Sequence, residues 1–86
     1  MQDPEVRFYY EHEKAKEKLA QAVHVARSKA HLTQAALAKK IGTSQSVIAR
    51  LESGKDSRMP SMPLLSSIAK ACGGFLEIGF RFSKSA

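Results

Sequence analysis

The sequence has very few cysteines and no long apolar run, and both absences exclude classes of protein. Its single cysteine, Cys72, cannot form an internal disulfide, which fits a protein of the reducing cytoplasm. No stretch approaches the roughly 18 consecutive apolar residues that a membrane-spanning helix needs. Residues 1–18 are crowded with charges and lack the apolar stretch of a signal peptide. We therefore expect a cytoplasmic protein that does not associate with a membrane.

Patterns that carry catalysis or bind metal ions are also absent. The three histidines have no metal-ligand spacing with one another or with Cys72, and neither HExxH nor CxxC occurs. No glycine-rich loop suited to a phosphate is present. A lone cysteine in an alanine-rich stretch is more typical of a small core residue than of a reactive thiol. We expect no enzyme activity, no metal and no cofactor.

Acidic residues are scarce beyond residue 18. Residues 1–18 hold five acids and four bases, net −1, whereas residues 19–86 hold ten bases and three acids, net +7. The formal net charge of +6 therefore lies on the body of the chain. A small basic domain attracts polyanions, and double-stranded DNA is the commonest polyanion that a folded domain meets. RNA binding and mere solubility are the alternatives that charge alone leaves open.

The apolar residues that are present follow a helical spacing over the first third of the chain. The 86 residues provide room for one domain with a modest core. Leu19, Val23, Ala26 and Ala30 recur at steps of three or four, which predicts an amphipathic helix over residues 13–30.

Hydroxyl side chains and glycines divide the middle of the chain. Thr33, Ser44 and Ser61 are predicted N-caps, because a side-chain oxygen can accept a bond from a free N–H of the first turn. The three helices that they begin are expected to end at glycines, which tolerate the left-handed conformation: Gly42, Gly54 and the pair Gly73-Gly74. Residues 55–60 are a predicted polar loop.

The spacing of the apolar residues changes from a helical period to alternation at residues 75–82. Alternation of apolar with polar or small residues predicts a single half-buried β-strand whose apolar members are Leu76, Ile78, Phe80 and Phe82. Because the chain offers no second strand, we expect this one to pair with its copy in another molecule about a two-fold axis. The rival is a monomer in which the strand folds back on its own helices.

The segment 34–53 has the spacing of a helix-turn-helix. Two helices joined by a tight turn cross steeply only if a contact residue is small and the turn admits a positive φ. Ala38 supplies the small contact, Gly42 the turn, and Ile48 and Leu51 the apolar anchors of the second helix. The alternative is an ordinary four-helix bundle with a glycine-terminated helix.

The run from Leu32 to Lys55, LTQAALAKKIGTSQSVIARLESGK, closely resembles the phage-repressor/Cro (Xre) type of helix-turn-helix domain. With the helices on either side, the resemblance covers about residues 19–74. Two positions depart from the family pattern. His31 stands where the family usually has glycine, although histidine tolerates positive φ better than most residues. Ala36 replaces the usual glutamate, so no capping box forms with the preceding threonine.

The resemblance implies a mainly α fold with a four- to five-helix repressor-like domain, and the alternation at residues 75–82 adds a single C-terminal β-strand used for dimerisation. The DNA-binding domain is expected at residues 19–74, with its motif at 34–53. Residues 1–18 are expected to form a charged and aromatic extension that continues into the first helix, and residues 75–86 the strand and tail.

The resemblance also implies roles for single residues. The third helix of such domains lies in the major groove, which implies base contacts by Gln45, Ser46 and Arg50. Phosphate contacts are implied for Gln34, Ser44 and Lys55. The alternative for the three base-contact residues is that they are simply a solvated face of the helix. Arg27 and Glu52 match a pair that the family often joins as a buried salt bridge.

The whole chain also resembles HigA-type antitoxins, which bind a small ribonuclease toxin and repress their own operon. A toxin-binding role is expected for the N-terminal aromatics Phe8, Tyr9 and Tyr10, unless they cover the flank of the bundle. The implied partners are a palindromic DNA operator, a second copy of the chain and a small toxin protein. A stand-alone regulator without a toxin is the alternative, and a protein-interaction adaptor a third.

Overall fold

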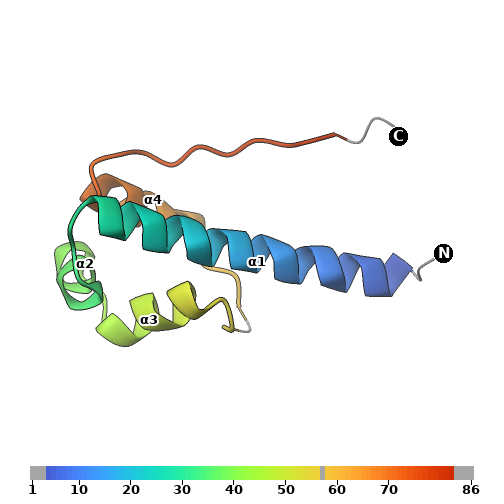
Figure 1. Ribbon diagram of the computed structural model, residues 1–86, viewed down its shortest axis with the longest axis horizontal. Coiled ribbons are helices and arrows are strands. Elements are labelled where there is room, and N and C mark those ends of the chain that lie inside the picture. The colour runs from blue at the N-terminus through green and yellow to red at the C-terminus, as the bar shows by residue number, and fades with distance from the viewer. Residues whose placement is uncertain (1–3, 57, 83–86) are drawn as a thin grey trace.

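The computed structural model describes residues 4–56 and 58–82, with side chains described from residue 13 onward. Four helices make up most of this part: α1 (Pro4–Lys29), α2 (Gln34–Ile41), α3 (Gln45–Ser53) and α4 (Met62–Ala71). Figure 1 shows α1 running along the molecule, with the three short helices gathered around its C-terminal half. None of the described helices has both the length and the apolar character needed to cross a membrane.

Helix α1 begins at Pro4, well before the predicted start at residue 13. Proline suits the first turn of a helix because its φ is already helical and its missing N–H would have had no partner there. The side chains of Phe8, Tyr9 and Tyr10 lie outside the described part. Beyond the end of α1, His31 has a φ of 58°, so histidine does adopt the left-handed conformation expected of it.

The three predicted N-caps are confirmed. The side chains of Thr33, Ser44 and Ser61 each accept a hydrogen bond from the backbone N–H three residues on, over 3.0, 3.3 and 3.2 Å. Helices α2 and α3 end at Gly42 and Gly54, both in the left-handed conformation, whereas the C-cap of α4 is Cys72 and the left-handed Gly73 follows it. These ends were predictable because capping depends on residues that are neighbours in the sequence.

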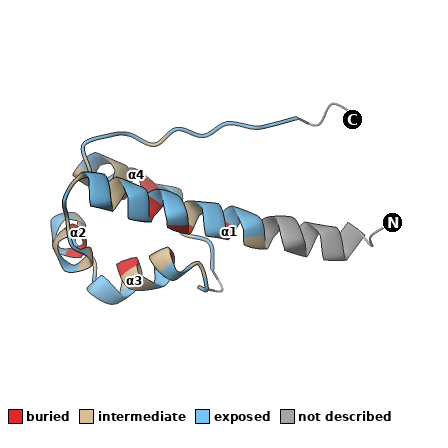
Figure 2. Cartoon of the chain, viewed as in Figure 1, coloured by how far each residue is buried: buried red, intermediate tan, exposed pale blue. Residues whose placement is uncertain are grey.

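The hydrophobic core lies where the four helices meet. Leu37 of α2 and Ile48 of α3 have no exposed surface at all. Helix α2 packs on α3 and α4, and α3 packs on α1. Figure 2 shows the buried segments of α1, α2 and α3 turned toward one another. The buried members of the core are Val23, Leu37, Ala38, Ile48, Leu51, Leu65 and Ile68.

The prediction of a β-strand over residues 75–82 is wrong for the single chain. This segment is extended, but the described residues contain no strand. Leu76 is half-buried against the core, whereas Ile78, Phe80 and Phe82 are exposed. A strand is defined by backbone bonds to a neighbouring strand, and the helices nearby already use their own N–H and C=O groups internally. The alternating pattern therefore predicted that this segment is extended and apolar, but it did not identify a second backbone for it to pair with.

Candidate nucleic-acid interface

A tight turn fixes α3 relative to α2. Gly42 has a φ of 77°, and its N–H donates to the carbonyl of Lys39 over 3.3 Å. The next N–H, that of Thr43, donates to the carbonyl of Ala38 over 2.9 Å. The buried side chain of Ala38 is a single methyl group, which lets the two helices approach closely. The turn therefore holds α3 at a set angle.

Helix α3 has an apolar inner face and a polar outer face. Ile48 and Leu51 are buried in the core and hold the helix against α1 and α2. The side chains expected to contact bases are all exposed: Gln45, Ser46 and Arg50. In Figure 2, α3 forms an outer edge of the molecule. A rigidly held helix thus presents hydrogen-bonding groups to the surroundings.

A buried carboxylate ties three helices together at the far end of α3. The side chain of Glu52 is only 6% exposed and lies 2.6 Å from Nε and 3.0 Å from Nη2 of Arg27. Its Oε1 is also 3.1 Å from Nδ1 of His24 and 3.4 Å from Nε2 of Gln34. Arg27 in addition donates to the carbonyl of Leu32 over 2.8 Å, which fixes the turn between α1 and α2.

Both members of this ion pair are held in their charged forms. Burial by itself raises the pKa of Glu52, but the hydrogen bonds from Arg27, His24 and Gln34 outweigh it, and the pKa lies below its ordinary value. The hydrogen bond to Glu52 raises the pKa of Arg27. A buried charge requires its partner, so the pair has a structural role and holds α3 on α1.

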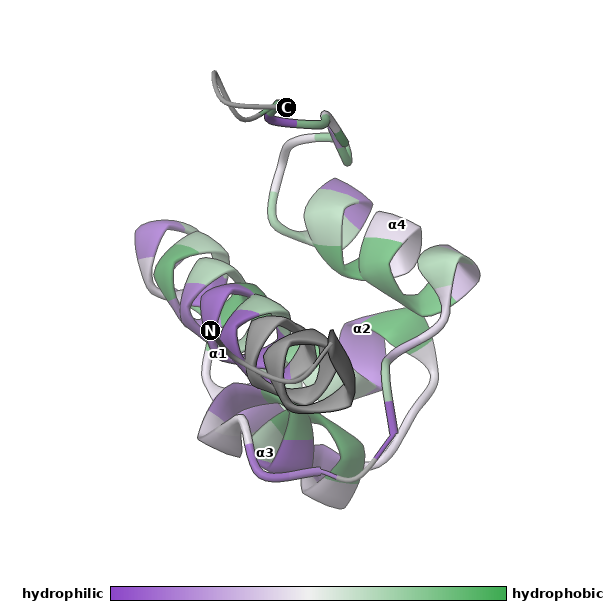
Figure 3. Cartoon of the chain, turned by 90° about the vertical axis from the view of Figure 1, so that its right-hand side faces the viewer, coloured by the Kyte–Doolittle hydropathy of each residue, from purple (hydrophilic) through white to green (hydrophobic). Residues whose placement is uncertain are grey.

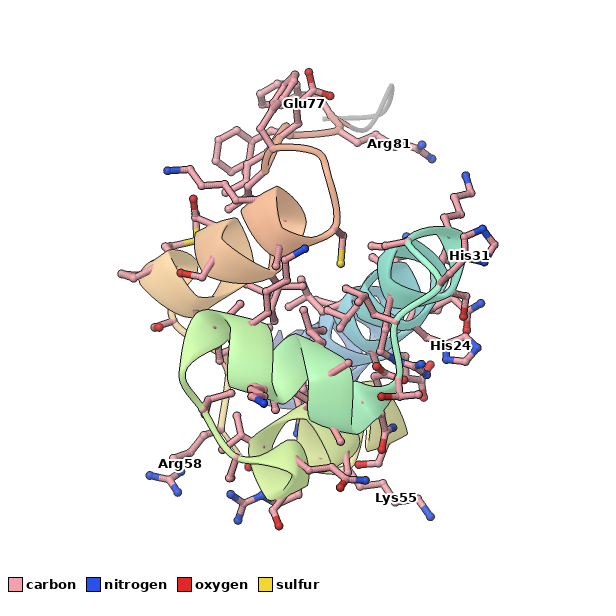
Figure 4. All side chains as sticks on the ribbon, turned by 90° about the vertical axis from the view of Figure 1, so that its left-hand side faces the viewer. His24, His31, Lys55, Arg58, Glu77 and Arg81 are labelled. Atoms are coloured by element: carbon pink, nitrogen blue, oxygen red, sulfur yellow. The ribbon has the colours of Figure 1, made fainter. Side chains whose placement is uncertain are left out.

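The residues expected to contact phosphates lie near the ends of the two motif helices. Gln34 opens α2 and is half-buried, with its amide directed to Glu52. Ser44 is exposed and caps α3. Lys55 is exposed just beyond α3, and its backbone N–H donates to Oγ of Ser53 over 3.1 Å. Figure 4 shows the Lys55 side chain pointing outward on the side of the molecule where α3 lies.

The geometry of α2, the turn and α3 agrees with a comparison of the sequence with known families. A helix-turn-helix family model matches residues 23–74, which is more than half of the chain. The chain belongs to the helix-turn-helix family. It is therefore a DNA-binding transcriptional regulator whose partner is double-stranded DNA. Neither a curated protein nor a solved structure matches the chain.

One basic residue of this helix-turn-helix protein was not singled out by the sequence. Arg58 is exposed in the loop between α3 and α4, where its backbone N–H donates to Oδ1 of Asp56 over 3.1 Å. A groove of about 230 Å³ is lined by both Arg50 and Arg58. Figure 4 shows Arg58 pointing outward on the same side as Lys55. The sequence signal for Arg58 was a basic residue in a polar loop, just beyond the run from Leu32 to Lys55 that resembles the family.

The described residues offer no arrangement suited to a metal ion. No group of three or more His, Cys, Asp or Glu side chains comes together among them. Cys72 is half-buried and packs against the core. Burial raises the pKa of its thiol, which keeps it protonated and weakly nucleophilic at neutral pH.

Proposed function

We propose that the protein is a sequence-specific repressor in which α3 reads the base edges of an operator. The observation that carries this proposal is the exposed polar face of α3, held by a buried apolar face and a rigid turn. A glutamine can bond bidentately to adenine, an arginine to guanine, and a serine to several bases. The proposed base contacts are Gln45, Ser46 and Arg50.

Contacts to phosphates set the position of α3 on the duplex in this proposal. Gln34 and Ser44 lie at the starts of α2 and α3, where unpaired N–H groups favour anions. Lys55 and Arg58 are exposed on the side of α3 and add positive charge there. Such contacts supply affinity without sequence preference, whereas the base contacts supply the preference.

We propose that the repressor acts as a homodimer on a palindromic operator. One recognition helix reads only a few base pairs, and two copies about one DNA turn apart read a palindrome and double the phosphate contacts. The exposed apolar side chains of residues 75–82 support a contact between two copies, because such side chains gain by leaving water.

We also propose that the protein is the antitoxin of a type II toxin–antitoxin pair. In this role it neutralises a small ribonuclease toxin and represses its own operon. The support is that α1 starts at Pro4, far ahead of residue 23 where the family match begins. The helical stretch that precedes the match carries the aromatics Phe8, Tyr9 and Tyr10 in its sequence. The proposed activity requires no catalytic group, metal or cofactor.

Selection of binding sites from random DNA tests the repressor role. We expect the purified full-length chain to enrich a palindrome whose half-sites lie about one helical turn apart. Sequences without any common motif would contradict sequence-specific binding.

Co-expression with the product of the neighbouring reading frame tests the antitoxin role. Co-purification with a small basic protein whose ribonuclease activity is suppressed would support it. Specific DNA binding without such a partner would instead identify a stand-alone transcriptional regulator.

A further inference from the structure

An apolar groove separates α1 from α4. These two helices scarcely touch, since α1 packs mainly on α3 and α4 packs mainly on α2. The groove between them has a volume of about 160 Å³. Its walls are mostly apolar and include Ala22 and Ala26 of α1, Ile68 and Ala69 of α4, and Leu76 of the C-terminal segment. An apolar depression of this kind is costly to leave open to water.

The segment that leaves the groove is itself strongly apolar. Leu76 packs against the core, but Ile78, Phe80 and Phe82 are 61%, 87% and 84% exposed. Figure 3 shows this segment standing off from both α1 and α4. An unfilled apolar groove and an exposed apolar segment therefore lie side by side in one molecule.

Folding the segment down into its own groove does not satisfy its backbone. An extended chain buried alone among helices loses water at every N–H and C=O, and the helices have no spare backbone groups to replace it. A second extended segment removes this cost, because two antiparallel segments bond to each other along one edge. Another copy of residues 75–82 both fills the apolar groove and provides backbone hydrogen bonds to the first segment.

We propose that the groove between α1 and α4 seats the C-terminal segment of a second copy of this chain. The two segments pair antiparallel near their middles, and one apolar face of the pair closes the grooves of both molecules. This inference rests on the proposed homodimer and identifies the surface of the helical domain that the segment binds.

The exposed aromatic side chains supply part of the area that a stable dimer needs. An aromatic side chain buries about 150–250 Å², so Phe80 and Phe82, which share one face of the extended segment, together provide at least about 300 Å² on each copy. A stable interface buries about 800 Å² per partner. Ile78 and the groove walls supply apolar area toward the remainder.

The location of the groove also suits two copies on one DNA duplex. The C-terminal segment and α4 lie on one side of the molecule, and α3 lies on the other, in both Figure 1 and Figure 3. The two-fold axis of an antiparallel pair can run perpendicular to its face. If the paired segments cover the two grooves on that side of the dimer, both α3 helices lie on the opposite side and face in the same direction.

The oligomeric state of matched variants tests the proposal. Ala22→Glu places a charge in the groove, whereas Gln21→Glu places the same charge on the neighbouring exposed position outside the groove lining. We expect sedimentation of the full-length wild type and Gln21→Glu to show dimers at tens of micromolar. Ala22→Glu should weaken dimerisation by about tenfold or more, as should Phe80→Ser with Phe82→Ser. Circular dichroism checks that each variant is folded.

An oxidative cross-link tests which copy fills the groove and does not depend on the charged variant. Ala22→Cys and Phe82→Cys are combined in a Cys72→Ser background. A disulfide that joins position 22 of one chain to position 82 of another supports the proposal. A disulfide within one chain, a link between like positions only, or none, overturns it.

The failure of this inference can be told apart from failure of the proposed function. A dimer that survives Ala22→Glu but is lost with the phenylalanine substitutions overturns the groove as the seat while leaving the homodimer intact. A monomeric wild type overturns both. Binding to a single half-site of DNA is expected to be unchanged in Ala22→Glu, because the groove lies away from α3.

Discussion

At the scale of single residues, Glu52 has the most demanding environment in the described part of the chain. Its carboxylate is nearly buried, and the groups that surround it come from α1 and α2. Because the pKa of Glu52 is lower in the folded state than in the unfolded chain, its ionised form stabilises the fold. This stabilisation is complete above the unfolded pKa of about 4.3 and is lost as the pH falls through the folded pKa.

Replacing Glu52 by glutamine should therefore destabilise the protein most at neutral pH. We expect a loss of about 3 kcal/mol at pH 7, because Arg27 is left with an unpaired and partly buried charge. Urea unfolding at pH 7 and at several values below 4 measures the difference between the two proteins. The difference should shrink on acidification, and a gap that stays constant with pH would contradict the assignment.

Arg50 carries the sharpest prediction about DNA. Arg50→Ala should cost about 1–3 kcal/mol at the selected operator and relax the preference at one base pair, because the proposed contact of Arg50 to a base edge is lost. Lys70→Ala removes the same charge from the exposed surface of α4 and serves as the control. Binding-site selection with both variants gives the answer. An unchanged base preference in Arg50→Ala would exclude a base contact.

At the scale of elements, the turn between α2 and α3 depends on one backbone conformation. Gly42 has a positive φ, and a Cβ atom added there would meet nothing within 4 Å. The cost of a side chain is therefore that of the left-handed conformation rather than of a clash. Gly54 at the end of α3 also has a positive φ, but it lies closer to its neighbours, since a Cβ there would be 3.5 Å from Cβ of Ala20.

Substituting Gly42 separates conformation from packing. We expect Gly42→Ala to lower the free energy of unfolding by about 1–2 kcal/mol. Gly42→Asn should lower it less, because asparagine visits the left-handed region more readily. Chemical denaturation of the three proteins measures both values. Equal losses in the two variants would show that the φ of this residue does not set the cost.

The N-terminal half of α1 carries the prediction about the toxin. In the proposed antitoxin role, deletion of residues 1–12 should abolish capture of the toxin while sparing operator binding, because the family match begins only at residue 23. Pull-down with the tagged toxin and a gel-shift assay on the same preparation measure the two activities. Full neutralisation by the shortened chain would place the toxin-binding surface elsewhere.

At the scale of the whole molecule, the net positive charge and the proposed dimerisation together determine the affinity for DNA. Most of the positive charge lies beyond residue 18, and DNA affinity that rests on phosphate contacts falls steeply with salt. A dimer makes twice as many phosphate contacts as a monomer, so its affinity should have about twice the salt dependence.

Removal of residues 75–86 tests this link between assembly and binding. Light scattering should show a dimer for the full chain and a monomer for the shortened one. The slope of log affinity against log salt on the full operator should fall by about half. A full-length chain that is monomeric at tens of micromolar would reject the dimer.

The sequence by itself was sufficient for features that depend on neighbouring residues. Thr33, Ser44 and Ser61 cap helices because a hydroxyl needs only the N–H three residues on. Gly42 ends α2 because a left-handed residue is required there whatever surrounds it. The helical spacing of Val23 and the anchor positions Ile48 and Leu51 likewise predicted residues that are buried in the core, since periodicity decides which side of a helix is apolar.

Only the tertiary structure decided features that depend on residues far apart in the sequence. The participation of His24 and Gln34 at Glu52 required α1, α2 and α3 to be placed in space. The position of Arg58 beside α3 depended on the path of a loop that has no periodic pattern. The alternation of residues 75–82 predicted a strand, yet a strand exists only where another backbone completes its hydrogen bonds, and one chain of this protein provides none among its described residues.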